Sequence, residues 1–528
     1  MSSGQLAAAL DERAQKQPDF NVLIFENGNH PPEYITYRDI VQKGQAMARL
    51  WLASGIKPGE TVALIAYNHP EFVYSLYAAS HTGITLVPID PRASADNILY
   101  QLTDCQSQGV IFSNELYEKI APVLEKTHPH KLSAILYKDG FASPQRPDFL
   151  ALHQLLQQAT GTEQVPPSSG SARLEVIYTS GTTGRPKGVT IKEERLILYV
   201  MLARQVWQYK PDDILYTGLS LTHGNAQVIT LIPALYLGIR AVISRRFTKS
   251  RIWDICRQYG CTSFSLLGGM MMGIYSEPPR PDDADNPVRL VISAGTPRSI
   301  WQDFERRFGV QIHEWYGAVE GGFAHKPPGI GPVGSFGKPL EDLMEMKVVR
   351  EDDSECAPGE IGELVSRLRT GPTTVEYHGN PEASAEKTRG GWLRSGDMCY
   401  RDEQGWFYFA YRKGGGLRRQ GEFIQPEEVE KVLAEHPAVC DVCVYGVPAT
   451  SGAPGESDLV AAIVFFPGHA INPQELFRHC RQHLSANCVP SYIQVVEQIP
   501  KSASEKNLDR LLREAFSPTA PNVFKKEG

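Results

Sequence analysis

Short apolar runs alternate along the chain with stretches of helical periodicity, and this alternation constrains the fold more than any other feature of the sequence. The strand-like runs lie at 61–66, 84–89, 109–112 and 290–293, and helix-like stretches lie at 70–81 and 300–308. Strands that alternate with helices are typical of parallel sheets, because each parallel connection needs a crossover that a helix can fill. The sequence therefore predicts an α/β fold built of layers.

The chain is too long for a single compact domain. Its 528 residues exceed the usual domain size of about 100 to 200 residues. Three consecutive glycines within residues 412–416 give the backbone unusual freedom, and a helix with proline and acids in its first turn is predicted to begin at Pro426. We therefore predict a large N-terminal domain of layered α/β subdomains over 1–411, a hinge at 412–416, and a small mobile α+β domain over 417–528.

Composition and charge exclude several classes of protein. The net charge of −7 argues against nucleic acid as a partner, because binding to the phosphate backbone needs a basic face. No apolar window reaches the length of about 18 residues that a membrane span requires, and residues 1–11 lack the apolar core of a signal peptide. Nine scattered cysteines are typical of reduced thiols. We expect a cytoplasmic protein without a membrane span.

A loop rich in hydroxyls and glycines follows one buried apolar run. Residues 178–188 read Tyr-Thr-Ser-Gly-Thr-Thr-Gly-Arg-Pro-Lys-Gly. Glycines let backbone N–H groups approach a phosphate, hydroxyls donate to its oxygens, and a lysine adds charge. Pro186 breaks the Gly-Lys-Ser/Thr ending of a Walker loop, and a surface turn would share the composition. The candidate phosphate-binding residues are Thr179, Ser180, Gly181, Thr182, Thr183, Gly184 and Lys187.

The same string resembles the signature loop of the adenylate-forming superfamily, which includes acyl-CoA synthetases, peptide-synthetase adenylation domains and beetle luciferases. Further segments resemble later motifs of this superfamily, in the same order along the chain: 219–225, 293–297, 315–320, 394–397 and 500–506. The resemblance covers nearly the whole chain. It implies an enzyme that uses ATP to activate a carboxylic acid.

The resemblance implies two segments at the adenine base. Residues 293–297 read Ser-Ala-Gly-Thr-Pro, where the small residues Gly295 and Thr296 would let the base lie against the backbone. Residues 315–320 read Trp-Tyr-Gly-Ala-Val-Glu, and Tyr316, between Trp315 and Gly317, would stack on adenine. These residues are therefore expected to bind ATP.

The ribose and the metal have their own expected partners. By the same resemblance, Glu320 would hold Mg²⁺, a hard cation that prefers carboxylate and phosphate oxygens. Asp397 would accept hydrogen bonds from both ribose hydroxyls, for which one ionised carboxylate has enough acceptor sites, and Arg412 would join it. Val319 replaces the threonine usual in this motif, so a hydroxyl expected near the phosphate is missing.

Two further segments resemble those that line the acyl pocket in the superfamily. In the first, His223 would gate the pocket and help to receive ATP, and Asn225 follows it closely. In the second, Gly268, Gly269 and Met270 would form an accommodating apolar wall, because methionine is flexible. Ordinary core packing after a buried strand would explain the second segment equally well.

The C-terminal part resembles the mobile domain of the superfamily. Residues 500–506 read Pro-Lys-Ser-Ala-Ser-Glu-Lys, in which Glu505 replaces a usual glycine and Lys506 keeps the register of the catalytic lysine. Gly414 falls on the hinge position, which usually carries Asp or Lys. Gly421 and Glu422 match a loop that approaches coenzyme A after the domain rotates.

The resemblance implies two half-reactions. A carboxylate attacks the α-phosphate of Mg·ATP and forms an acyl-adenylate; then the thiol of coenzyme A attacks its carbonyl and releases AMP. The expected catalytic residues are His223, Glu320 and Lys506. The alternatives are transfer to the phosphopantetheine of a carrier protein, a luciferase-like oxygenase, and a non-catalytic nucleotide-binding protein. The acid itself stays open among fatty, alicyclic, aromatic and carnitine-like acids, as does the choice between monomer and homodimer.

Overall fold

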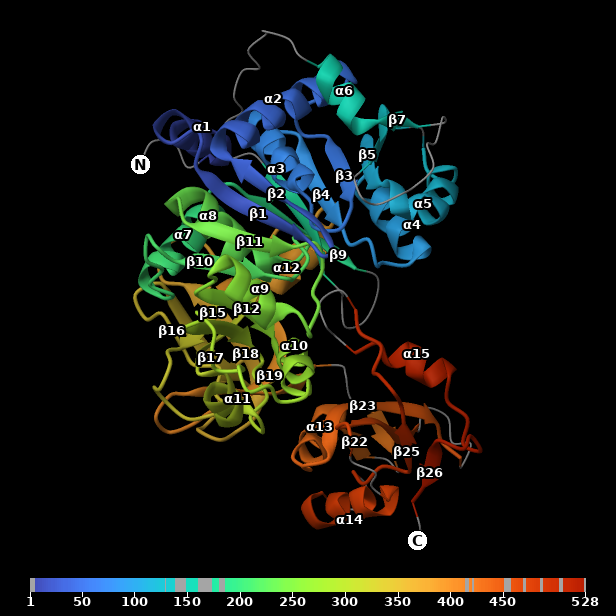
Figure 1. The fold of residues 1–528 in the computed structure, drawn as a ribbon. Coiled ribbons are helices and arrows are strands. Elements are labelled where there is room, and N and C mark those ends of the chain that lie inside the picture. Colours follow the sequence, from blue (N-terminus) through green and yellow to red (C-terminus); the bar gives the residue numbers. More distant parts are fainter. Residues whose placement is uncertain are drawn as a thin grey trace.

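The computed structural model places its described residues in two units of unequal size (Figure 1). It describes residues 5–128, 130–137, 149–159, 173–179, 186–413, 417–419, 422–450, 457–468, 472–484, 488–502 and 507–526. No helix in these ranges is long and apolar enough to cross a bilayer. All nine cysteines lie within them as reduced thiols.

A mostly parallel sheet of seven strands forms one layer of the large unit. Its order is β7 (Leu150–Ala151), β6 (Leu132–Leu136), β5 (Gly109–Ser113), β3 (Thr61–Ile65), β4 (Thr85–Ile89), β8 (Arg173–Thr179) and β9 (Lys187–Lys192). Only the edge strand β9 runs antiparallel, as the partner of β8. The three strands predicted at the start of the chain are confirmed as β3, β4 and β5.

A second sheet, of nine strands, packs beside the first. Its order is β16 (Lys338–Pro339), β15 (Gly321–Lys326), β14 (Gln311–Ala318), β13 (Leu290–Ala294), β12 (Ser263–Leu267), β10 (Ile214–Thr217), β11 (Arg240–Ser244), β1 (Asn21–Asn27) and β2 (His30–Thr36). The central strands from β14 to β1 are parallel. Their carboxyl ends therefore meet at one edge, where loops can form a site.

Helices cover the faces of both sheets (Figure 1). They are α1 (Leu6–Lys16), α2 (Tyr37–Ala53), α3 (Pro70–Thr82), α4 (Ala95–Asp104), α5 (Tyr117–Leu124), α6 (Leu152–Gln158), α7 (Arg195–Gln205), α8 (Ile232–Leu237), α9 (Ile252–Tyr259), α10 (Gly268–Tyr275) and α11 (Trp301–Phe308), with a π-helical turn at Ala226–Leu231. The predicted helices at 70–81 and 300–308 are confirmed as α3 and α11. Thr36 and Asp39 form a capping box that begins α2.

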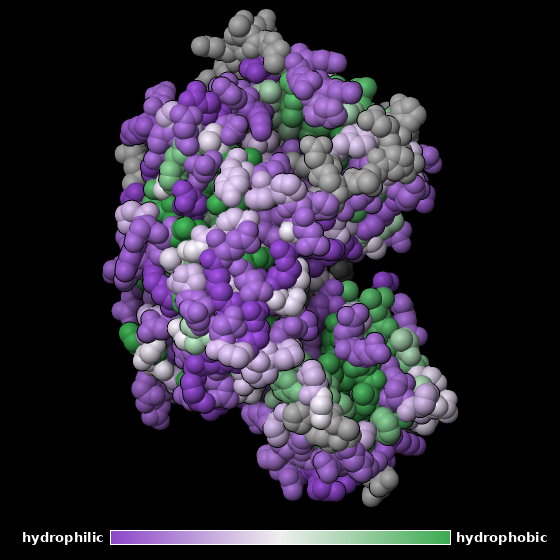
Figure 2. Space-filling view, in the orientation of Figure 1, coloured by the Kyte–Doolittle hydropathy of each residue, from purple (hydrophilic) through white to green (hydrophobic). Residues whose placement is uncertain are grey.

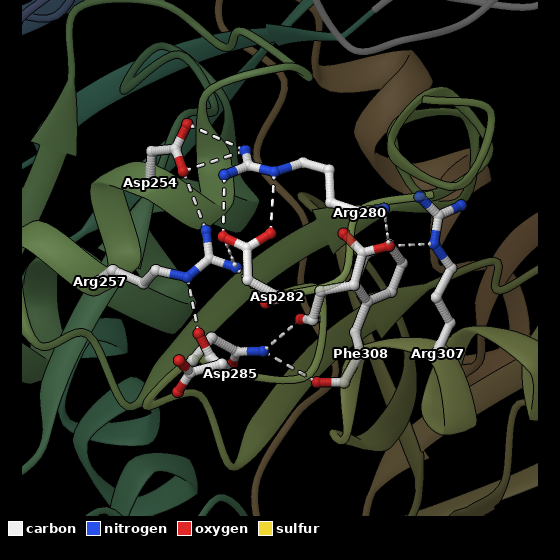
Figure 3. Close-up of polar contacts among 9 residues, drawn as sticks. Asp254, Arg257, Arg280, Asp282, Asp285, Arg307 and Phe308 are labelled. Atoms are coloured by element: carbon white, nitrogen blue, oxygen red, sulfur yellow. Dashed lines mark hydrogen bonds and ion pairs between the residues drawn. The ribbon is translucent and has the colours of Figure 1, made fainter. Parts of the chain in front are cut away.

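An arginine and aspartate network ties down the segment between α10 and β13 (Figure 3). Arg280 bonds Asp254 on α9 at 3.1 Å, and Arg307 on α11 donates to Asp283 at 2.7 Å. Arg257 on α9 also donates to the carbonyl of Asp285 at 2.6 Å. These contacts hold the polypeptide that leads into β13, which carries one of the predicted nucleotide loops.

The chain leaves the large unit through a four-stranded antiparallel sheet. Its strands are β17 (Met344–Val349), β18 (Gly362–Leu368), β19 (Leu393–Arg401) and β20 (Phe407–Arg412), with α12 (Pro381–Lys387) before β19. Strand β20, the partner of β19, leads into the glycine-rich segment. The residues predicted for the ribose lie on these two strands.

The small unit has its own sheets, helices and core. It contains β21 (Leu417–Arg419), β22 (Glu422–Ile424), α13 (Pro426–Ala434), β23 (Val439–Pro448), β24 (Ser457–Phe465), α14 (Pro473–His483), β25 (Tyr492–Val495), α15 (Asp509–Glu514) and β26 (Val523–Lys525). Apolar residues of α13 and α14 pack against β24 around the buried Ile463. In the view of Figure 2, hydrophobic residues gather on the part of this unit nearest the large one. The predicted fold class, a large α/β domain with a small α+β domain, is confirmed.

Candidate active site

The predicted phosphate loop connects the two strands of a β-hairpin. Strand β8 ends at Thr179 and β9 begins at Lys187, and these two residues are paired across the hairpin. The Thr179 hydroxyl donates to the Lys187 carbonyl at 3.4 Å. The other predicted residues of the loop, Ser180, Gly181, Thr182, Thr183 and Gly184, lie outside the described residues. The described part of this hairpin loop is therefore its base, at Thr179 and Lys187.

Tyr377 connects this hairpin to the expected metal ligand. The Lys187 ammonium lies 5.2 Å from the centroid of the Tyr377 ring, and the Tyr377 hydroxyl donates to Glu320 at 3.0 Å. Tyr377 pairs with Val189 of β9 through an isolated bridge. The sequence prediction missed Tyr377, because one tyrosine in a polar segment carries no local signal. Three segments distant in the chain therefore meet around one phenol.

A second phenol connects the predicted base and ribose positions. The Tyr316 hydroxyl donates to Asp397 at 2.5 Å, and its ring stacks on Phe336 with centroids 4.7 Å apart. Burial and the neighbouring Asp397 raise the pKa of Tyr316 well above its usual value. The phenol therefore stays protonated and acts as a donor.

The two residues predicted for the ribose are adjacent. Asp397 on β19 and Arg412 on β20 are directly paired across the antiparallel ladder. Asp397 is buried, and its backbone N–H donates to the Ser395 hydroxyl at 2.9 Å. The carboxylate is thus held at a defined place beside Tyr316.

A buried carboxylate that the sequence prediction missed holds the loop after β13. Glu314, 3% exposed, accepts hydrogen bonds from the backbone N–H groups of Gly295 at 2.7 Å and Thr296 at 3.2 Å. The Thr296 hydroxyl also donates to it at 2.5 Å. Burial raises the pKa of Glu314 to about 7. The sequence signal that could have identified Glu314 is an acidic residue within a strand-like segment, next to Trp315.

The motif around Tyr316 divides between the two faces of β14. Trp315 is buried in a core cluster beside Trp207 and Phe323, because successive strand residues point to opposite faces. A side chain at Gly317 would come within 2.7 Å of the Trp315 indole. The indole of Trp315 therefore points away from Tyr316.

The loop that carries His223, the predicted acyl gate, adjoins the motif around Tyr316. A side chain at Gly224 would lie 3.4 Å from Val319, so the two segments are in near contact. The Asn225 backbone N–H donates to Nδ1 of His223 at 3.2 Å. Asn225 is 4% exposed, and both polar atoms of its side chain lack a hydrogen-bond partner among the residues that the structure describes. A polar group that meets no partner at a buried place is unusual in a folded protein.

The second predicted acyl segment is the first turn of α10. A side chain at Gly268 would come within 2.0 Å of the Gly295 carbonyl, so α10 lies directly against the loop after β13. Gly269 follows it in the helix, and Met270 is buried within the main core. Core packing therefore explains the burial of Met270. The lack of a side chain at Gly268 lets the backbone of α10 approach the backbone of the loop after β13.

A basic pocket of 290 Å³ lies beside these residues. Its lining includes Lys187, Tyr377, Lys387, Arg394, Gly396 and Lys413. Arg389, Glu363 and Glu386 also line it. The two acids partly balance the charge, since Glu363 lies 3.5 Å from Arg394 and 3.4 Å from Lys413. Such an excess of cations favours an anion such as phosphate.

Four further predicted residues lie wholly or partly outside the described structure. Lys506, Gly414 and Gly421 lie outside the described residues, and Glu422 is described as the first residue of β22 without its side chain. Among the described residues, no three His, Cys, Asp or Glu side chains gather as a metal site.

The fold is that of a large α/β unit with a hairpin between β8 and β9 beside the candidate site, followed by a small C-terminal unit. The profile of the AMP-binding enzyme family matches residues 10–374, and the profile of the AMP-binding enzyme C-terminal domain matches residues 428–506. The chain belongs to the AMP-binding enzyme family, and its predicted membership in the adenylate-forming superfamily is confirmed.

Relatives and solved structures resemble the chain over almost its full length. Long-chain fatty acid transport protein 1 of Rattus norvegicus is 28% identical over 97% of this chain and 83% of its own length. The crotonobetaine/carnitine–CoA ligase of Citrobacter koseri is 28% identical over 95% of this chain and 98% of its own. An anthranilate CoA ligase in complex with anthranoyl-AMP has a TM-score of 0.84 at 23% identity, covering 97% of each chain. A benzoate CoA ligase from Burkholderia xenovorans has a TM-score of 0.82 at 22% identity, covering 96% of this chain and 99% of its own. These structures show the shared fold.

Proposed function

We propose that the chain is an AMP-forming acid–thiol ligase, which activates a carboxylic acid with Mg·ATP and transfers the acyl group to coenzyme A. The convergence of two phenol–carboxylate pairs carries this proposal: Tyr316 with Asp397 at 2.5 Å, and Tyr377 with Glu320 at 3.0 Å. The cationic pocket beside them adds the charge that a triphosphate needs. A nucleotide site with two fixed carboxylates suits a ribose at one and a metal at the other.

Magnesium fits the donor set of this site. Glu320 offers a hard oxygen ligand, and the absence of a three-ligand cluster among the described residues suits a cation that keeps waters and binds through substrate phosphates. When bound, Mg²⁺ would neutralise phosphate charge during the reaction. Tyr377 would keep one oxygen of Glu320 occupied and so orient the other.

In the first half-reaction the difficulty is that two anions must meet. A carboxylate oxygen bonds to the α-phosphorus while the bond to the pyrophosphate oxygen breaks. Lys506 would donate to the carboxylate and phosphate oxygens and offset their charge, a role that suits a compact ammonium. Lys187 and the hairpin hydroxyls would hold the outer phosphates. His223 would gate the entry of the acid.

In the second half-reaction the thiol attacks the adenylate carbonyl and AMP leaves. The large domain over 1–411 would stay in place while the small domain over 417–528 turns about a hinge at 412–416. Rotation about Gly414 would withdraw Lys506 and bring Gly421 and Glu422 towards coenzyme A. The three consecutive glycines of the hinge support this, because glycine permits large changes in backbone angles.

Relatives support coenzyme A over a carrier protein as the acceptor. The relative from Citrobacter koseri is named a CoA ligase and matches over 98% of its length. The names of the relatives suggest both fatty and carnitine-like acids as substrates. We place the enzyme in the cytoplasm, where nine reduced thiols are stable.

A panel of carboxylic acids tests the proposal. The full chain is incubated with Mg·ATP, coenzyme A and one acid at a time, and AMP, pyrophosphate and acyl-CoA are measured. We expect at least one acid to produce all three, with AMP release that depends on both the acid and coenzyme A. Acid-dependent pyrophosphate release that yields thioester only on a phosphopantetheine carrier would favour the alternative. Nucleotide binding without turnover on any acid class would contradict the proposal.

A further inference from the structure

A second basic pocket lies on the large unit, apart from the residues assigned to ATP and the acid. Its volume is 310 Å³, and it is lined by the turn between β1 and β2 and by the segment after β11. Strands β1 and β11 are parallel neighbours (Figure 1). Its lining includes three arginines, Arg245, Arg246 and Arg251, and one acid, Glu26.

One of the three arginines, Arg251, is fixed by a buried acidic partner. The buried Glu26 accepts from Arg251 at 2.8 Å and also from the backbone N–H of Gly28 and the hydroxyl of Ser244, both at 2.9 Å. Because these contacts hold Glu26, the Arg251 guanidinium is held too. A preorganised guanidinium loses little entropy when a ligand binds.

Arg245 is anchored on the other side of the pocket. Its side chain is 9% exposed, it forms an ion pair with Glu115, and its guanidinium lies 4.8 Å from the centroid of the Tyr67 ring. Arg246 differs from both, because it is exposed and forms no ion pair with any residue in the described ranges. The pocket thus presents one uncompensated guanidinium next to two that are held in position.

One buried side chain connects this pocket to the loop that carries His223. The Asn68 amide donates to the carbonyls of Leu219 at 2.8 Å and Ser244 at 2.9 Å, and its oxygen accepts from the Leu221 N–H at 2.8 Å. The Asn68 N–H donates to the Arg245 carbonyl at 3.2 Å. Asn68 therefore connects the chain at Arg245, which lines the pocket, to the loop that carries His223.

We propose that this pocket binds the phosphate groups at the nucleotide end of coenzyme A, an inference that rests on the proposed function. An acceptor thiol must reach the acyl carbonyl near His223, while the charged end of the molecule stays at the surface. Arginine matches phosphate oxygens with paired N–H donors. A phosphopantetheine on a carrier protein lacks this nucleotide end, so the pocket distinguishes coenzyme A from a carrier protein.

The test compares coenzyme A with pantetheine, which lacks the nucleotide. The variants are Arg246→Gln and Arg246→Glu, and Arg306→Gln on α11, whose side chain is 75% exposed outside the pocket, is the control. We expect Arg246→Gln to raise the KM for coenzyme A about tenfold, the worth of one charge-assisted hydrogen bond, and Arg246→Glu to raise it further. The KM for pantetheine should stay the same, so the ratio of the two constants changes. The control should keep the wild-type ratio.

Two results would overturn the inference. The first is a ratio of KM values that is the same in the Arg246 variants and the wild type, whether both constants rise or neither does. The second is failure of adenosine 3′,5′-bisphosphate to compete with coenzyme A in the wild-type enzyme. Competition that weakens in Arg246→Glu supports the inference. The wild-type chain alone tests the proposed function, since its thioester product appears whether or not the Arg246 variants change the ratio.

Discussion

Glu314 organises the loop after β13 from a buried position. It accepts hydrogen bonds from three donor groups of Gly295 and Thr296, and the side chain is 3% exposed. Burial disfavours the charged carboxylate, which explains its raised pKa. The residue therefore links the protonation state of one carboxyl group to the geometry of a predicted adenine contact.

We expect Glu314→Gln to flatten the pH dependence of stability. The folded-state pKa of about 7 lies above the ordinary value of 4.5, so the neutral acid stabilises the fold fully below pH 4.5. That stabilisation is lost as the pH rises through 7, by up to about 3 kcal/mol. Glutamine mimics the neutral acid and should remove this loss. Thermal melting of both proteins from pH 4.5 to 8 measures the difference, and parallel profiles would contradict the assignment.

Helix α10 depends on one glycine for its position. A side chain at Gly268 would come within 2.0 Å of the Gly295 carbonyl, closer than any real contact. The first turn of α10 and the loop after β13, which is predicted to contact adenine, are therefore in backbone contact. A change at this point moves both elements together, because packed interiors transmit strain.

Gly268→Ala should weaken ATP binding and stability together. The added methyl group must displace the Gly295 loop, and we expect a loss of about 1 to 3 kcal/mol in stability, as in other overpacked sites. The KM for ATP should rise with it. Gly273→Ala is a matched control on the same helix, because a side chain there meets only Lys249, at 3.7 Å. Equal effects of the two substitutions would rule out a specific contact between helix and loop.

The two units of the molecule divide the predicted chemistry between them. The large unit contains the residues that meet around Tyr377 and Tyr316, while the small unit carries the segment that ends in Lys506. The flanks of that segment, Lys501 and Asn507, are paired, and Lys501 forms an ion pair with Asp441 at 2.6 Å. We therefore predict that one half-reaction depends on the small unit more than the other.

Lys506→Ala should abolish adenylate formation and largely spare thioester formation from a supplied acyl-adenylate. The reason is that the lysine offsets charge only while the carboxylate meets the α-phosphate. Acid-dependent pyrophosphate exchange measures the first step, and acyl-CoA formed from synthetic adenylate measures the second. Lys525→Ala, an exposed lysine of the same unit, serves as the control. Pyrophosphate exchange that persists in Lys506→Ala would show that the lysine is not catalytic.

Local patterns in the sequence were sufficient for the layers of the fold, and they also predicted most of the candidate site residues. Strand β3 and helix α3 lie where the apolar periodicity predicts them, because that periodicity is a property of neighbouring residues. Asp397, Glu320 and Tyr316 were identified from motifs that are contiguous in the chain. These motifs also predicted the family that the profile match confirms.

Only the tertiary structure decided which side chains meet. Tyr377 reaches Glu320 across a sequence separation of 57 residues, and Asn68 connects two strand ends more than a hundred residues away. No local pattern encodes such contacts, since they depend on how the carboxyl ends of parallel strands are brought to one edge. The sequence by itself determined the alternation of strands and helices and the family, and it predicted the phosphate loop. The packing of the sheets decided the phenol–carboxylate pairs, the buried support of Glu314 and the second basic pocket.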